Sequence, residues 1–231
     1  MAALIVTLRH PETSTTFIDR FLATCEAYRV PACVIFNKVD LLSDAEQNDL
    51  ASLRGLYESL GYPTYAISAL KDAEVVRGQL ASIFDGRITL LSGNSGVGKS
   101  TLLNAILGEN VARTGAISSV HHKGMHTTTF SEMYPLEEMN QGLESNGLYH
   151  SWIIDTPGIK GFGVLDMQRS EVGHYFREIF EIGRDCRYSD CIHMNEPGCA
   201  VNNAVIDGRI ALSRYESYLS MLDDITENKY R

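Results

Sequence analysis

Apolar stretches alternate with amphipathic stretches along most of the chain, which is the pattern of alternating strands and helices. The apolar run Ala3–Leu8 predicts a buried strand. The next stretch, Thr13–Tyr28, predicts a helix because its apolar residues recur at helical spacing behind a Ser/Thr cluster that can cap it. Further strands are expected at Ala32–Phe36, Thr64–Ser68 and Ile88–Ser92, and further helices at Asp44–Leu60, at Asp72–Phe84 and directly after the last of these strands.

The second half of the chain has a different pattern. Thr127–Leu136 and Leu148–Asp155 predict an antiparallel strand pair joined by a polar loop. The remaining residues predict short helices, a Cys/His cluster and a helical segment over Val205–Ile225. We therefore expect an α/β fold with a mostly parallel sheet over residues 1–168, followed by a small α-helical domain over residues 169–231.

Composition limits the function classes. The 231 residues contain 44% apolar residues and carry a formal net charge of −9, so a surface that attracts phosphate backbones everywhere is excluded, although a local basic patch is not. No apolar run has the length of a membrane span, and the segment after Met1 lacks the features of a signal peptide. We expect a cytoplasmic protein whose five cysteines are thiols or metal ligands.

The strongest motif is a phosphate-binding loop. Gly93, Gly98, Lys99 and Ser100 have the full Walker A spacing, between an apolar run and a helix-forming run. Glycines allow backbone N–H groups to converge on phosphates, the lysine reaches the β- and γ-phosphates, and the serine hydroxyl binds Mg²⁺. The alternative is a glycine-rich turn that merely contains a lysine. The expected phosphate-binding residues are Gly93, Asn94, Ser95, Gly96, Val97, Gly98, Lys99, Ser100 and Thr101.

Two further motifs extend this site. In "DTPG", Asp155 ends a buried strand and can hold Mg²⁺, while the backbone N–H of Gly158 can approach the γ-phosphate. In "NKVD", the Asp40 carboxylate can accept two hydrogen bonds from guanine, Asn37 can reach the guanine carbonyl side and the phosphate loop, and the stem of Lys38 can lie over the ring.

A short "ISAL" motif places Ser68 and Ala69 one strand–helix unit later, where a backbone N–H can meet the guanine carbonyl. Each of these short motifs is alone more often a polar turn. Together they indicate a GTP/GDP site with Mg²⁺.

A cysteine cluster indicates a second metal. Cys186, Cys191, His193 and Cys199 form C-x4-C-x-H-x5-C, and three thiolates with one imidazole are a complete tetrahedral zinc set without an open position. The alternative is a set of reduced cysteines in a small core beside an exposed histidine. The segment is too polar to form its own core, so we expect one Zn²⁺. Cys25 and Cys33 fit the helix and strand patterns and are expected to be packing residues.

The motifs NKVD, SAL, GNSGVGKS, TTT and DTPG resemble those of a Ras-like P-loop GTPase, but the base-reading motifs precede the phosphate loop. The chain therefore resembles a circularly permuted GTPase. "HKGMHTTTF" and the Cys/His cluster resemble the RsgA family, the circularly permuted GTPases of small ribosomal subunit biogenesis. The resemblance implies GTP hydrolysis to GDP and phosphate, a late role in assembly and maturation of the 30S subunit, contact with rRNA, a monomer, and a structural zinc domain. Arg184, Arg187 and Lys123 are candidates for contact with rRNA phosphates, although each is more often a solvated charge.

Three features depart from the resemblance. The family carries an N-terminal OB-type barrel, whereas this sequence starts at the first expected strand of the GTPase domain. Met125 stands where arginine is expected before the threonines. Ile159 occupies the position at which Ras-like enzymes carry a glutamine that orients water, so intrinsic hydrolysis is expected to be slow and to depend on another group.

The expected catalytic residues are Lys99, His126 and Thr128. His126 or a group on the ribosome is the candidate for orienting water, and Thr128 or Thr129 is expected to bind the γ-phosphate and Mg²⁺ together with Ser100 and Asp155. Two other function classes stay open at this point. One is a non-catalytic GTP-dependent RNA- or ribosome-binding module, and the other is a P-loop ATPase or kinase with an NKVD-like turn.

Overall fold

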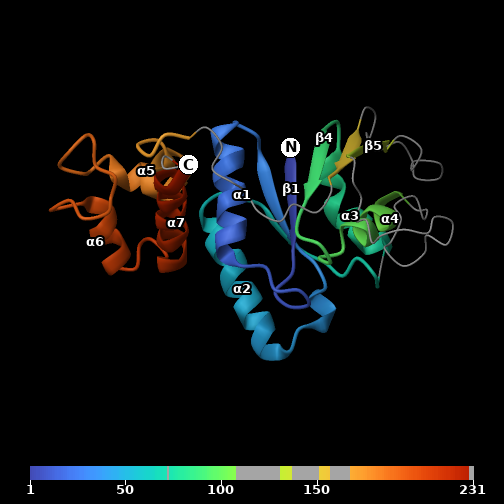
Figure 1. Cartoon of the computed structure of the whole chain (residues 1–231). Coiled ribbons are helices and arrows are strands. Elements are labelled where there is room, and N and C mark those ends of the chain that lie inside the picture. Colours follow the sequence, from blue (N-terminus) through green and yellow to red (C-terminus); the bar gives the residue numbers. More distant parts are fainter. Residues whose placement is uncertain (72, 108–130, 137–150, 157–166, 229–231) are drawn as a thin grey trace. The chain divides into compact units, whose positions relative to one another are not determined.

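The computed structural model of the chain describes residues 1–71, 73–107, 131–136, 151–156 and 167–228 (Figure 1). Its contacts form two compact units. The first contains Met1–Thr13, Ala32–Glu58 and Tyr62–Lys160, and the second contains Ser14–Pro31, Ser59–Gly61 and Gly161–Arg231.

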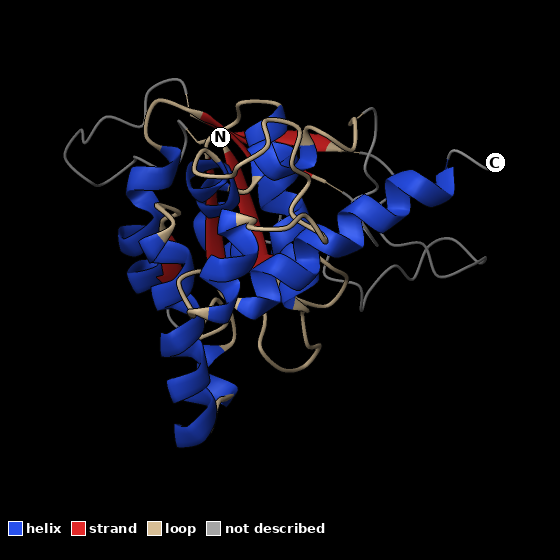
Figure 2. Ribbon diagram, turned by 90° about the vertical axis from the view of Figure 1, so that its left-hand side faces the viewer, coloured by secondary structure: helices blue, strands red, loops and turns tan. Residues whose placement is uncertain are grey.

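The first unit is built on one six-stranded sheet with the order β3-β2-β1-β4-β6-β5, and its strands run side by side (Figure 2). Neighbouring strands are parallel except for β5 and β6, which are antiparallel. This confirms the mostly parallel sheet and the predicted antiparallel pair. The strands are β1 (Ala2–Val6), β2 (Ala32–Phe36), β3 (Thr64–Ala66), β4 (Ile88–Ser92), β5 (Glu132–Pro135) and β6 (Trp152–Asp155).

Every residue of the neighbouring interior strands β1 and β2 is buried. This is the pattern of parallel strands covered on both faces. On one face, Ala3 and Ile5 belong to a core with Leu80 of α3 (Ala73–Phe84) and Leu102 of α4 (Lys99–Leu107). Another helix, α2 (Asp44–Ser59), buries Leu50 and Tyr57.

The first strand is shorter than the sequence pattern predicts, ending at Val6 rather than Leu8. The cause is a local turn. The backbone N–H of Thr7 donates to Thr13 Oγ1 at 3.3 Å, and the Thr7 hydroxyl donates to the Pro11 carbonyl at 2.5 Å. These bonds replace the strand ladder and bend the chain at the edge where the candidate site lies.

The second unit is helical. It contains α1 (Thr15–Ala27), a 3₁₀ helix (Val172–Tyr175), α5 (Arg177–Gly183), α6 (Ala200–Ile206) and α7 (Leu212–Asn228). Helix α1 is capped by Ser14, whose side chain accepts from the Phe17 N–H, and it packs along α7 (Figure 1). The boundary expected after residue 168 stays a prediction; α1 lies before it in the sequence and packs with residues that follow it.

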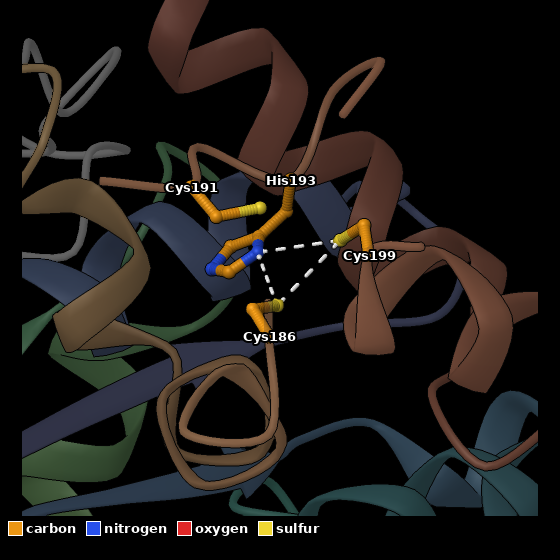
Figure 3. Close-up of side chains that lie close together, drawn as sticks. All are labelled: Cys186, Cys191, His193 and Cys199. Carbon is orange, nitrogen blue, oxygen red and sulfur yellow. Dashed lines mark hydrogen bonds between the residues drawn. The ribbon is translucent and has the colours of Figure 1, made fainter. Parts of the chain in front are cut away.

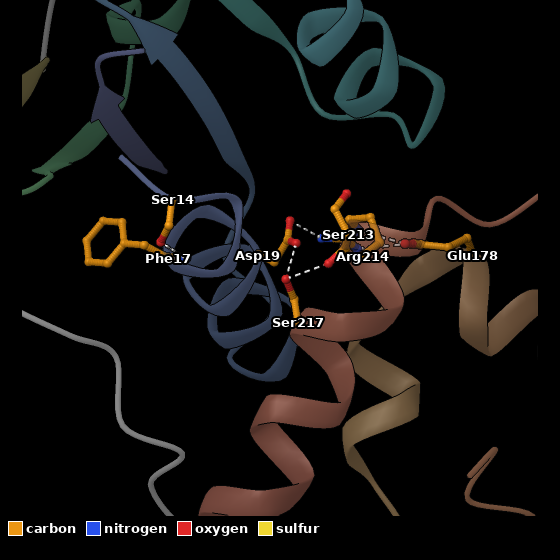
Figure 4. A network of polar contacts seen from close by, with 7 residues as sticks. All are labelled: Ser14, Phe17, Asp19, Glu178, Ser213, Arg214 and Ser217. Carbon is orange, nitrogen blue, oxygen red and sulfur yellow. Dashed lines mark hydrogen bonds and ion pairs between the residues drawn. The ribbon is translucent and has the colours of Figure 1, made fainter. Parts of the chain in front are cut away.

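A buried ion network explains why α1 packs with α7 (Figure 4). Arg214 of α7 is 1% exposed; its Nη1 lies 2.8 Å from Asp19 Oδ1 and its Nε 2.6 Å from Glu178 Oε1. Ser217 donates to the second oxygen of Asp19 at 2.6 Å. Removing one member of such a buried pair leaves the other charge buried without a partner and typically lowers the free energy of unfolding by about 3–5 kcal/mol. Helices α1, α5 and α7 are therefore expected to fold together.

Candidate functional site

The candidate nucleotide residues come from the ends of four strands. Asn37 follows β2, Ser68 and Ala69 follow β3, Gly93 follows β4, and Asp155 ends β6. These four strands are mutually parallel, so their carboxyl ends lie at one edge of the sheet. Ligands of open α/β sheets bind at this edge.

The side-chain amide of Asn37 connects the three predicted nucleotide loops. Its Nδ2 donates to the carbonyl of Val97 in the phosphate loop at 2.9 Å, and its Oδ1 accepts from the backbone N–H of Ala69 at 3.0 Å. Asn37 is 4% exposed. Both ends of a buried amide are therefore used, and the base-reading loop is held against the phosphate loop.

Two glycines of the phosphate loop leave no room for a side chain. A Cβ on Gly98, which has a φ of +98°, would lie 2.4 Å from Asn37 Nδ2. A Cβ on Gly93 would lie 2.3 Å from the Ile5 carbonyl oxygen. The glycines of the motif thus serve the packing of this loop on β1 and on Asn37, in addition to the close approach of phosphate that the motif predicts.

Lys38 and Asp40 continue from Asn37. Lys38 has a left-handed backbone, and its Nζ donates to the Gly96 carbonyl at 2.7 Å and to the His10 carbonyl at 2.5 Å. The backbone N–H of Asp40 donates to Ser68 Oγ at 3.1 Å, and the Asp40 carboxylate lies 3.4 Å from Lys71 Nζ.

The electrostatics at Asp40 suit an acceptor. The hydrogen bond from the Ser68 side chain, with a smaller contribution from Lys71, lowers the pKa of the Asp40 carboxyl below its ordinary value despite some burial. The carboxylate is therefore ionised at neutral pH and accepts hydrogen bonds, as guanine recognition requires.

Lys99 and Asp155 lie at the phosphate end. Lys99 Nζ donates to the carbonyls of Gly93 at 2.6 Å and Asn94 at 3.0 Å. Burial lowers the pKa of Lys99 and raises that of Asp155, and the opposite charge of each acts against this shift in the other. The two charges thus lie within electrostatic reach of each other.

Asp155 fits the predicted magnesium role. It is 6% exposed, and its Oδ1 is buried without a hydrogen-bond partner among the described residues. A buried, unpartnered carboxylate oxygen is costly unless a cation or its water shell satisfies it. Ser100 is the second residue of α4 and half-buried. The candidate ligands thus come from the helix that follows the phosphate loop and from β6, the sheet neighbour of β4.

The cysteine cluster has the geometry of a tetrahedral zinc site (Figure 3). The ligand atoms of Cys186, Cys191, His193 and Cys199 all lie within 4.8 Å of one another. His193 Nδ1 lies 3.5 Å from the Sγ of Cys186 and of Cys199, and these sulfurs are 3.8 Å apart. A tetrahedral Zn²⁺ with bonds of about 2.3 Å to sulfur and 2.0 Å to nitrogen implies S–N edges of about 3.5 Å and S–S edges of about 3.8 Å, so Cys186, His193 and Cys199 fit the ion, with the Cys191 sulfur close by.

The surrounding residues hold the zinc-ligand loop. Tyr215 donates its hydroxyl to the His193 carbonyl at 2.6 Å, and Tyr218 donates to the Ile192 carbonyl at 2.6 Å. The Glu196 carboxylate accepts three backbone N–H groups of the loop at 2.8–3.1 Å. A Cβ on Gly183 would lie 3.1 Å from His193 Nε2, so a small residue there makes room for the imidazole.

Comparison with known proteins gives a family. The model of the RsgA GTPase family matches residues 1–165. The chain is 55% identical over 228 residues to the small ribosomal subunit biogenesis GTPase RsgA of Phocaeicola vulgatus, covering 99% of this chain and 69% of the relative. It is 49% identical to the protein of the same name from Porphyromonas gingivalis W83, covering all of this chain and 70% of that protein.

The chain belongs to the RsgA GTPase family. Solved structures agree with this assignment. YjeQ from Thermotoga maritima is similar with a TM-score of 0.75 and 31% identity, covering 98% of this chain and 71% of that one. YloQ, described as a circularly permuted GTPase, is similar with a TM-score of 0.77 and 28% identity, and the match covers 100% of this chain and 69% of the YloQ chain. The predicted resemblance to a circularly permuted GTPase is thus supported by a solved structure at 28% identity.

The structure brings most of the predicted GTPase residues together. Asn37, Lys38, Asp40, Ser68 and Ala69 lie around the phosphate loop, as the contacts above describe. His126, Thr128 and Gly158 lie outside the described residues, as do Lys123, Met125, Thr129 and Ile159. Their predicted roles stay predictions.

Sequence reasoning missed several supporting residues. The carbonyl of His10 holds Lys38, and Lys71 pairs with Asp40. Neither has a motif that could have identified it, because a backbone carbonyl or a single exposed lysine leaves no pattern. Glu132 lies opposite Asp155 in the strand ladder, a relation that no sequence motif shows.

Gly98→Ala tests the packing of the phosphate loop on Asn37. We expect GDP affinity to fall by about 10- to 100-fold, because the new methyl must displace the buried amide and strain a positive-φ backbone. Fluorescence titration with a labelled GDP measures this. Gly78→Ala in α3, where a Cβ meets nothing within 4 Å, is the control. Equal affinities of the two variants would contradict the packing argument.

Cys186→Ser tests the zinc site. We expect purified wild-type protein to carry close to one zinc per chain and the variant to carry about a tenth of that or less, because three ligands do not complete a closed structural site. Elemental analysis measures the content, and loss of helical signal at lower urea reports the folding consequence. Cys25→Ala removes a buried cysteine of α1 and should keep its zinc. Full zinc content in Cys186→Ser would exclude this ligand set.

Proposed function

We propose that this protein hydrolyses GTP to GDP and phosphate and acts as a late assembly and maturation factor of the small (30S) ribosomal subunit. The observation that carries the proposal is the buried Asn37 amide, which joins a guanine-reading loop to a Walker A loop. Family membership and the names of relatives at 55% and 49% identity support the ribosomal role.

Guanine binding is assigned to one end of the site. Asp40, kept ionised by Ser68 and Lys71, accepts the paired N–H donors that distinguish guanine from adenine. The backbone N–H of Ala69, which the sequence predicts to meet the guanine carbonyl, donates instead to Asn37 Oδ1. Its contact with guanine stays a prediction. Lys38, anchored on the Gly96 carbonyl, presents its stem beside the base site.

Phosphate binding and hydrolysis are assigned to the other end. The N–H groups of Gly93–Thr101 surround the phosphates, and the Lys99 ammonium leaves the loop carbonyls to bind the β- and γ-phosphates, where it stabilises the charge that develops as water attacks in line. Mg²⁺ bound by Ser100, Asp155 and Thr128 would supply further charge stabilisation on the phosphates. Thr128 is assigned to contact the γ-phosphate as well as Mg²⁺. His126 is assigned to orient the attacking water, because Ile159 stands where Ras-like enzymes carry the glutamine that does so.

The small ribosomal subunit is expected to stimulate the hydrolysis step. Because isoleucine cannot orient water by hydrogen bonding, we expect weak hydrolysis alone and stimulation by the small subunit. The partner surface would include rRNA, and we expect the protein to act as a cytoplasmic monomer. Among the described helices, none has the length and apolarity to cross a membrane.

Zinc is assigned a structural role. The Cys₃His donor set has no open position, so it offers no site for substrate. It holds together the loop between α5 and α6, on which Arg184 and Arg187 lie as candidate contacts for rRNA phosphates.

Single-turnover hydrolysis with purified subunits tests the proposed function. We expect phosphate release from γ-labelled GTP to rise by at least about tenfold when small subunits are added, equivalent to about 1.4 kcal/mol of barrier, and not with large subunits. No release in either condition would favour a non-catalytic binding module. Release that is equal with and without small subunits would contradict the proposed partner.

Co-sedimentation gives a second readout of the same proposal. We expect more protein to pellet with small subunits in a non-hydrolysable GTP analogue than in GDP, because contacts with the γ-phosphate order switch segments of GTPases that are released on hydrolysis. Equal or absent pelleting in both nucleotides would count against the ribosomal role.

A further inference from the structure

An edge strand places a second carboxylate beside Asp155. In the antiparallel pair of β5 and β6, Glu132 is the direct partner of Asp155, and Tyr134 is the partner of Ile153. Opposed residues in such a ladder point to the same face, with Cβ atoms about 4.5–5.5 Å apart. Glu132, Tyr134, Ile153 and Asp155 therefore share one face of the sheet.

The three polar groups interact on this face. The Tyr134 hydroxyl donates to Glu132 Oε2, which orients the carboxylate. Burial, followed by this hydrogen bond, raises the pKa of Tyr134 to about 12, so the phenol stays a donor. The negative charge of Glu132 also raises the pKa of Asp155, after the larger effect of burial.

The charge of this cluster is unbalanced. Two charges act on Asp155: the Lys99 ammonium, which favours its ionised form, and the Glu132 carboxylate, which opposes it. The Oδ1 of Asp155 is buried and has no partner in the described part of the chain. A hydrated divalent cation beside these two carboxylates would balance their charge and satisfy the buried oxygen of Asp155.

We propose that Glu132 is a positioning residue for Mg²⁺, holding water of the ion's shell by hydrogen bonds while Tyr134 orients its carboxylate. The inference rests on the proposed GTPase function and adds residues that its motifs do not contain. Glu132 acts on the metal and its waters, not on the base or the phosphates, and it links the ion to the strand that follows the threonine segment. A carboxylate that serves only the solubility of an edge strand would have no such effect.

The test is the release of a fluorescent GDP analogue, chased with unlabelled GDP, over a range of free Mg²⁺ concentrations. In the wild type, Mg²⁺ slows release with a defined midpoint concentration. In Glu132→Gln the midpoint rises about 5- to 10-fold, the equivalent of roughly one typical hydrogen bond. The release rate in EDTA stays the same, because the contacts with base and phosphates are untouched.

Two variants and a control sharpen the test. Tyr134→Phe raises the midpoint in the same direction by about 2- to 3-fold, since it only frees the carboxylate to rotate. Glu132→Asp keeps the negative charge on a side chain that is one methylene shorter, and it is the conservative variant if Glu132→Gln folds poorly. Its Mg²⁺ midpoint is also expected to rise. Met133→Gln alters a partly exposed residue of the opposite face of β5 and leaves the midpoint unchanged.

The outcomes separate this inference from the proposed function. A Glu132→Gln midpoint within twofold of the wild type overturns the positioning role while GDP binding stands. An equal change of the rates in EDTA and in Mg²⁺ also overturns it, because the effect is then on folding or nucleotide contacts. A shift that disappears when the KCl concentration is raised to screen charges overturns it as well, since it reflects a distant charge instead of a held water. Failure of the wild type to retain the GDP analogue defeats the proposed function itself, and this inference with it.

Discussion

The buried side-chain amide of Asn37 is the interaction on which the nucleotide site depends. One short group bridges the phosphate loop through Val97 and the SAL loop through Ala69, at 2.9 and 3.0 Å. Three segments that are far apart in the sequence thus take fixed positions relative to one another. Gly98 has no side chain because the amide occupies that space. Without this bridge, a base-reading loop and a phosphate loop would be two independent turns at the end of a sheet.

The same constraint explains why the permuted motif order is compatible with function. Parallel strands deliver their following loops to one edge regardless of the order in which the chain visits them. Strands β2 and β3 carry the base-reading loops and are completed before β4 reaches the phosphate loop, yet β1 lies between β2 and β4 in the sheet. The site requires neighbouring strand ends, and the sheet order β3-β2-β1-β4-β6 provides them.

Much of this arrangement could be predicted from the sequence, and the exceptions have physical reasons. Apolar runs predicted the strands, and motif spacing predicted the nucleotide loops and the Cys₃His cluster. The position of α1 could not be predicted, because an apolar helix face does not identify its partner. The structure shows that Asp19 of that helix pairs with Arg214, which lies 195 residues away in the sequence. Glu132 was missed because a single carboxylate on an edge strand has no motif, and its relation to Asp155 exists only in the strand register.

The most direct test of the central claim is the nucleotide preference of Asp40→Asn, with Asp49→Asn on the exposed face of α2 as the control. If Asp40 reads guanine from a loop that Asn37 clamps to the phosphate loop, the variant loses GTP affinity by at least about 100-fold, the equivalent of two hydrogen bonds to a carboxylate. It should at the same time gain affinity for xanthosine triphosphate, whose additional carbonyl matches an amide donor. Unchanged GTP binding in the variant, or tight binding of ATP by both variants, would contradict the account and favour a P-loop ATPase.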